Sequence, residues 1–266
     1  MVKNLNNKIL YRFIFEVRYY YGFTYLDRCG RTINRIMREN PEWRLYTKEP
    51  NPQEAPLINI YTRSIFNFSA LKYDLTLEHD PINKKTLTKD SLDVFSKQAD
   101  YLSTVVNEEL GLNDFSRIGI RIYYLIGTES NENSAILIEK LALFQKNEIL
   151  EQKLQGQIKG RDLAFIIASE DRKFRFSIEA VERQQSFDFD DIPLNIKPGR
   201  ISHDQNKLLA KQEVAKTHLK INPKYGVMID IDSYIENPLE IDAIEFIESS
   251  FSKNEQILTA LNPSKG

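Results

Sequence analysis

The sequence predicts an α+β protein: a ferredoxin-like (βαββαβ) half in residues 1–130 and a second α+β half in residues 131–266, packed on it. Apolar residues alternate along several segments, as in strands with one buried face. In other segments they recur every three or four residues, as in amphipathic helices. In the first half these segments follow in the order strand, helix, strand, strand, helix, strand, which is the ferredoxin-like order.

The clearest strand is predicted at residues 117–127, Arg-Ile-Gly-Ile-Arg-Ile-Tyr-Tyr-Leu-Ile-Gly. Its even-numbered positions from Ile118 to Ile126 are apolar or aromatic. Because side chains alternate between the two faces of a strand, Arg117, Arg121 and Tyr123 are expected on the opposite face. We expect this strand to lie at the centre of the fold.

The chain begins with a strand predicted at residues 9–21, with Glu16 and Arg18 on its polar face. A helix is expected at residues 23–39, with Leu26 among its apolar positions, ending before Pro41. Two strands follow at 57–66 and 71–78, joined by a hairpin loop at 67–70. The next helix is expected to begin at Asp90 or Ser91 and to end at Gly111.

The second half is predicted to contain both strands and helices. Strands are expected at 163–169, 173–181 and 225–235, and helices at 133–154, 204–219 and 238–261. Residues 184–200 are polar and irregular, and we expect a mobile loop there.

The composition is that of a globular protein, with 41% hydrophobic and 28% charged residues. The single cysteine, Cys29, cannot form an internal disulfide, which favours a reducing compartment. The apolar run at residues 9–15 is interrupted by Arg12 and is short for a signal peptide or a membrane span. We therefore expect a cytoplasmic protein that does not enter membranes.

Four arginines lie along one side of the first predicted helix: Arg28, Arg31, Arg35 and Arg38. Asp27 and Glu39 are placed to pair with Arg31 and Arg35. Together with nearby tyrosines, at positions 19–21 and 25, the stripe is a candidate for binding a nucleic acid backbone and its bases. Arg117, Arg121 and Tyr123 form a second candidate binding group, for which we favour a layer of ion pairs between the two halves.

The candidate catalytic pair is Asp230 and Asp232, which lie two apart on a predicted strand and so share one face. Two such carboxylates can hold Mg²⁺ in phosphoryl-transfer enzymes, and Glu179 is the candidate for a third acid. The three histidines lack zinc-ligand spacing with Cys29, and no Gly-rich phosphate loop or Gly-x-Ser-x-Gly motif is present. We therefore expect no cofactor, with magnesium at Asp230 and Asp232 as the alternative.

Several segments resemble an uncharacterised, sporadically distributed prokaryotic family, whose members share an Arg-Ile-Gly-Leu-Arg-Tyr-like strand and a late Asp-x-Asp strand. The likeness includes Phe-Glu-Val-Arg at 15–18, the Phe68-Ser69 pair with the strand at 71–77, Arg-Ile-Gly-Ile-Arg-Ile-Tyr at 117–123 and Ile-Asp-Ile-Asp at 229–232 before a helix with Phe251. Tyr123-Tyr124 replaces the usual Tyr-Asn. The resemblance implies a prokaryotic origin and patchy inheritance, which is associated with mobile elements and antiphage defence.

The first hypothesis for function is a non-enzymatic binding protein: a subunit or sensor that acts through protein contacts, including association as a homodimer. It follows from the incomplete catalytic motifs and from the uneven charge, basic near the N-terminus and acidic near the C-terminus. One alternative is a divalent-metal-dependent enzyme acting on nucleic acid or nucleotides. Another is a nucleic-acid-binding protein that uses the arginine helix.

Overall fold

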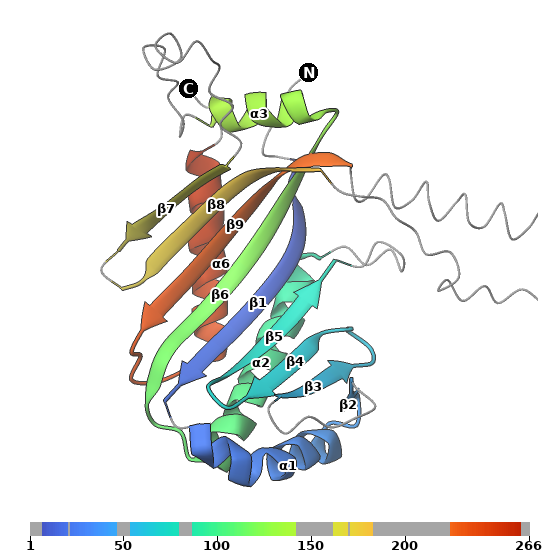
Figure 1. Cartoon of the computed structure of the whole chain (residues 1–266), viewed down its shortest axis with the longest axis vertical. Coiled ribbons are helices and arrows are strands. Elements are labelled where there is room, and N and C mark those ends of the chain that lie inside the picture. Colours follow the sequence, from blue (N-terminus) through green and yellow to red (C-terminus); the bar gives the residue numbers. More distant parts are fainter. Residues whose placement is uncertain are drawn as a thin grey trace, which may run out of the picture.

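A computed structural model describes residues 7–20, 22–46, 54–79, 87–141, 162–169, 171–182 and 224–261. The described strands form one antiparallel sheet of nine strands in the order β2-β3-β4-β5-β1-β6-β9-β8-β7. Helices α2 and α6 run along its far side in Figure 1, while α1 and α3 lie near its two ends. The chain is therefore an α+β protein, as its sequence predicts.

The centre of the sheet is β6 (Phe115–Thr128), which contains the predicted strand at 117–127. It pairs with β1 (Ile9–Tyr19) on one side and with β9 (Tyr225–Glu236) on the other. The even-numbered residues from Ile118 to Ile126 are at most 2% exposed, as their alternation predicts. The sheet is thus continuous across residue 130, where the sequence suggested a boundary between two domains.

In the first half, α1 (Gly22–Glu39) follows β1 and is succeeded by four short strands. These are β2 (Trp43–Leu45), β3 (Glu54–Asn59), β4 (Ile65–Ser69) and β5 (Lys72–Glu78). Helix α1 packs through Tyr25, Ile33 and Ile36. Leu26 is 59% exposed, so its expected place on the buried face is wrong; Tyr25, one position away, is buried instead.

A hairpin joins β4 and β5 at residues 70–71, close to the loop expected at 67–70, and a second hairpin, which was not predicted, joins β3 and β4. There the side chain of Asn59 accepts hydrogen bonds from the backbone N–H groups of Tyr61 and Thr62, both at 3.0 Å. Arg63 adopts a positive φ of 66°, which closes the turn. The apolar alternation runs on through this turn, so it gave no sign that the strand was interrupted.

Helix α2 (Lys89–Leu110) begins two or three residues earlier than predicted. Thr88 is the N-cap and exchanges hydrogen bonds with Ser91, which is therefore the third residue of the helix rather than its cap. Gly111 ends the helix in the left-handed conformation, with φ of 63°, as predicted. The apolar residues that recur every three or four positions along α2 are buried: Leu92, Phe95, Ala99, Leu102, Val106 and Leu110.

The second half adds α3 (Asn131–Lys140), β7 (Asp162–Ala168), β8 (Lys173–Glu182), β9 and α6 (Ala243–Ala260). Helix α6 begins after its N-cap Asp242, later than the predicted residue 238, because the Asp242 carboxylate accepts a hydrogen bond from Glu245 N–H at 2.8 Å. The expected mobile loop at 184–200 and the helix at 204–219 lie outside the described residues.

The core lies between the sheet and helices α1, α2 and α6. Phe13 of β1 contacts Phe95 of α2 with ring centroids 5.6 Å apart, and Tyr25 of α1 meets Phe68 of β4 edge-on at 4.7 Å. Residues on the helix side of the sheet are almost fully buried. The polar residues of the central strands lie on the other side. Among the described helices, none is both long and apolar enough to cross a membrane.

Candidate functional site

The candidate site is the face of the sheet turned away from α2 and α6, hereafter the open face. It is charged because the strands at the centre of the sheet alternate apolar residues toward the helices with polar residues outward. Figure 1 is viewed from this side. The charged residues of its centre are Glu16, Arg18, Lys72, Asp74, Arg117, Arg121, Arg175, Asp230 and Asp232.

Arg117 connects three strands across the open face. Its guanidinium donates hydrogen bonds to Glu16 of β1 at 2.7 Å and to both carboxylate oxygens of Asp232 of β9, each at 2.7 Å. The side chain reaches these acids by folding over Gly119, where an added Cβ would lie 3.0 Å from the guanidinium. The glycine between the two arginines of this strand thus has a geometric reason: Gly119 leaves room for the side chain of Arg117.

Arg121 binds the other carboxylate of the predicted catalytic pair. Its Nε lies 2.9 and 3.0 Å from the two oxygens of Asp230, and its Nη2 also donates to this carboxylate. The hydrogen bond to Asp230 raises the pKa of Arg121. Its guanidinium lies 5.1 Å from the ring centre of Tyr123, so the three residues form one cluster.

Glu16 is the centre of the network on the other side of Arg117. It also accepts hydrogen bonds from Arg18 at 2.7 Å and from Lys72 at 3.0 Å. Lys72 in turn lies 3.1 Å from Asp74. Burial alone would raise the pKa of Glu16, but the hydrogen bonds from Arg18 and Lys72 outweigh it and hold the pKa below its usual value.

Acidification should remove the stabilisation that Glu16 provides. Because its pKa is lowered by folding, its contribution is complete above the unfolded pKa of about 4.3 and is lost as the pH falls through the lower folded value. We expect the difference in unfolding free energy between the wild type and Glu16→Gln to be largest near neutral pH and to shrink as the pH falls below the unfolded pKa of about 4.3. Urea titrations of both proteins at several pH values measure this, and a constant difference would contradict it.

A shallow hollow of about 450 Å³ lies over this network. It is lined by residues of β1, β3, β4, β5, β6, β8 and β9 and is strongly polar. Arg175 of β8 lies opposite Asp232 in the strand register, yet Arg117 binds that carboxylate. Among the described residues, Arg175 has no ion pair, and it is an exposed residue that lines the hollow.

Asp230 and Asp232 share the open face, as their spacing predicts, but each is held by an arginine. Asp230 is 8% exposed, and burial raises the pKa of Asp232 despite the nearby charges of Arg117 and Arg121. The suggested third acid, Glu179, lies opposite Met228, whereas Ser177 lies opposite Asp230. The described part of the chain contains no group of three metal-ligating side chains. These contacts favour a structural ion-pair layer, and the magnesium alternative stays a prediction.

The arginine stripe of α1 meets the C-terminal end of α2. Arg28 donates to the backbone oxygen of Glu109 at 2.6 Å, Arg31 lies 2.8 Å from the Glu109 carboxylate, and Arg35 binds Glu108, Glu109 and Glu39. The expected pairing of Arg35 with Glu39 is thus confirmed, whereas Arg31 pairs with Glu109 rather than with Asp27. Acids at the end of α2 therefore neutralise much of the stripe.

The tyrosines expected to stack on bases are mostly unavailable. Tyr19 is 2% exposed and Tyr25 is fully buried, with its hydroxyl donating to the Phe68 carbonyl at 3.1 Å. Tyr20 is 53% exposed, but its hydroxyl donates to Asn237 at 2.9 Å. Burial raises the pKa of Cys29, which disfavours its thiolate form. His203 and His218 lie outside the described residues.

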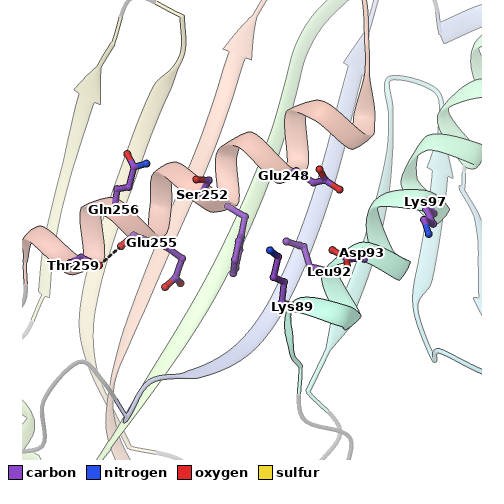
Figure 2. Close-up of a pocket in the computed structure, with 10 residues that line it drawn as sticks. Lys89, Leu92, Asp93, Lys97, Glu248, Ser252, Glu255, Gln256 and Thr259 are labelled. Carbon is purple, nitrogen blue, oxygen red and sulfur yellow. Dashed lines mark hydrogen bonds between the residues drawn. The ribbon is translucent and has the colours of Figure 1, made fainter.

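A second hollow, of about 940 Å³, lies between α2 and α6 on the helix side (Figure 2). Lys89 and Leu92 line it from α2, and Glu255 lines it from α6. Glu255 pairs with Lys8 at 2.9 Å and lies near the buried hydroxyl of Tyr124, whose pKa is raised by burial and by this charge. Since its walls lack a connected polar network, we place the candidate site on the open face.

Sequence reasoning found Arg117, Arg121, Tyr123, Asp230 and Asp232 but missed the other side of the network. Glu16, Lys72 and Asp74 complete it, and Arg175 lines the hollow beside it. A signal for them was present, because each lies on the polar side of an alternating strand. Alternation does not show which strands are neighbours in the sheet. The order of the strands decides which polar side chains contact each other.

The fold and the site define an α+β protein with one antiparallel sheet, helices on one side and an ion-pair network on the other. No protein-family model, no curated protein and no solved structure matches the chain. The resemblance to a sporadic prokaryotic family therefore stays a prediction, and function is inferred from the open face.

Proposed function

We propose that the protein is a non-enzymatic binding protein whose open face contacts a protein partner. The observation that carries this proposal is the ordered network on a face that no described helix covers. Arg117 and Arg121 are each held by carboxylates, so their geometry is set before a partner arrives. Ordering side chains in advance lowers the entropic cost of association.

Catalysis is disfavoured by the same contacts. A general base needs a carboxylate that is free to accept a proton, and a metal site needs carboxylate oxygens that are free to coordinate. Asp230 and Asp232 both accept hydrogen bonds through both oxygens from Arg121 and Arg117. The pair thus acts as a scaffold that aligns two guanidinium groups.

A protein partner fits the mixed charge of the open face better than a nucleic acid does. The carboxylates of Glu16, Asp74 and Asp232 line the same hollow as the basic groups and would repel a phosphate backbone. An acidic side chain of a protein needs only one exposed guanidinium, and Arg175 offers it. Nucleic-acid binding by the α1 stripe, a cytoplasmic location and a role in antiphage defence stay predictions.

Charge reversal at Arg175 should weaken partner binding. We expect wild-type protein to capture a stoichiometric partner from nuclease-treated lysate of the native host, and Arg175→Glu to bind it at least about tenfold more weakly, because like charges then face each other. Lys97→Glu is the matched control: it makes the same charge change on α2, at the opposite side of the sheet. Equal capture by Arg175→Glu and Lys97→Glu would contradict the proposal.

We further propose that β1, α1, β4, β5, α2 and β6 form a ferredoxin-like unit. Its support is the neighbour order β4-β5-β1-β6, in which every pair is antiparallel. Tyr25 of α1 and Phe95 of α2 pack on the same side of these strands, against Phe68 and Phe13. In such a unit the face opposite the helices stays open to a partner, which agrees with the proposed binding face.

A further inference from the structure

The two edges of the sheet differ in how they avoid pairing with another chain. At one edge, β2 has only three residues, Trp43–Leu45. Such a short edge strand offers few backbone groups. At the other edge, β7 has seven residues, Asp162–Ala168, and pairs only with β8 among the described strands. Its outer side therefore presents a row of backbone hydrogen-bonding groups.

Apart from Asp162 at its first position, β7 lacks the features that usually protect an edge. From residue 163 to 168 it reads Leu-Ala-Phe-Ile-Ile-Ala, without a proline or a charged residue. Ile166 is 60% exposed and Ile167 is 42% exposed, on opposite faces of the strand. An exposed apolar edge of this kind is a template for strand addition.

The hydrogen-bond pattern shows which residues of β7 point outward. Ser169 N–H donates to Arg172 C=O across the turn to β8, at 2.9 Å. Because the backbone groups of successive residues point to alternate sides, those of Ile167 also point to β8, whereas those of Ala164, Ile166 and Ala168 point to the free edge. The exposed Ile166 thus carries an outward N–H and C=O as well as an apolar side chain.

We propose that β7 pairs antiparallel with β7 of a second copy, in a symmetric dimer centred on Phe165. This register places Ala164 opposite Ile166 and Leu163 opposite Ile167, so every cross-strand pair from 163 to 167 is apolar. It also pairs outward-facing residues with outward-facing residues, as an antiparallel ladder needs. The strand is thus complementary to itself, which a two-fold interface requires.

The dimer would join two sheets edge to edge. Ile166 lies opposite Arg175 in the β7–β8 register and shares the open face with it. The open faces of both copies would therefore lie on one continuous sheet, with β7 of each copy at the centre. A partner that binds the open face would then meet two sites related by the two-fold axis.

Proline at position 166 tests the pairing selectively. Ile166→Pro removes an outward N–H while leaving the hydrogen bonds between β7 and β8, whereas Ile166→Thr keeps the N–H and the strand preference. Light scattering on eluting protein at tens of micromolar should give twice the chain mass of 31.1 kDa for wild type and Ile166→Thr, and a single chain mass for Ile166→Pro. Circular dichroism should be the same for all three.

Three results would overturn the proposal. A monomeric wild type would show that the β7 edge does not associate. A dimer that survives Ile166→Pro with unchanged mass would place the interface elsewhere. Open-ended assembly of the wild type would show head-to-tail pairing of unlike edges instead of a closed two-fold contact.

Discussion

Arg117→Met is expected to lower the free energy of unfolding by about 3 kcal/mol, because it leaves Asp232 buried without its hydrogen-bonding partner. Asp232 accepts hydrogen bonds only from Arg117 among the described residues, and its side chain is 17% exposed. Methionine keeps most of the apolar stem but no charge. Denaturant titration near neutral pH measures the loss.

The double variant Arg117→Met with Asp232→Asn separates lost charge pairing from lost packing. Replacing the Asp232 carboxylate, which has lost its partner, should restore much of the stability. The single variant should also lose less at pH 4 than at pH 7, since protonation neutralises a carboxylate whose pKa burial already raises. A double variant as unstable as the single one would show that the charge network is not what holds β6 and β9 together at this point.

Phe13→Ala is expected to cost about 4 kcal/mol, because it opens a cavity at the centre of the core. Phe13 is fully buried on β1 and packs against Phe95, which attaches α2 to the sheet. The midpoint of urea unfolding should fall while the slope stays near the wild-type value.

Phe23→Ala is the matched control for the core substitution. It removes the same atoms from a residue of α1 that is 86% exposed, so its effect should lie within about 0.5 kcal/mol of zero. Equal losses for Phe13→Ala and Phe23→Ala would contradict the packing of the helices on this face of the sheet.

Alternation predicted the strands well because each central strand has one dry face and one polar face. The even-numbered residues from Ile118 to Ile126 were predicted to be buried for this reason, and they are. The hairpin between β3 and β4 was not predicted, because its turn depends on Asn59, whose side chain accepts hydrogen bonds as a backbone carbonyl would. Such local chemistry leaves no periodic signal.

The network of the open face depends on strand neighbours that are far apart in the chain. Glu16 and Asp232 are both within hydrogen-bonding distance of Arg117, although more than 200 positions separate them in the sequence. Residue spacing showed that Asp230 and Asp232 share a face, but it did not show that β6 lies beside them. Two neighbouring arginines occupy the carboxylate oxygens of this pair that a metal ion would need.

The α1 stripe shows the same limit for helices. Spacing alone aligned the four arginines and offered partners in the same helix to Arg31 and Arg35 only. The fold supplies Glu108 and Glu109 from the end of α2. A helix C-terminus also favours nearby positive charge, so the stripe stabilises the contact between α1 and α2.

The most direct test of the proposed binding face is site-specific photo-crosslinking in the native host. A crosslinking residue at position 177, opposite Asp230 on β8, lies on the open face and keeps Arg175, whereas one at position 97 lies on the helix side of the sheet. We predict one protein crosslinked from position 177 that persists after nuclease treatment, and none from position 97. Crosslinks from position 97 alone, or crosslinks from 177 that consist of nucleic acid, would contradict a protein-binding open face.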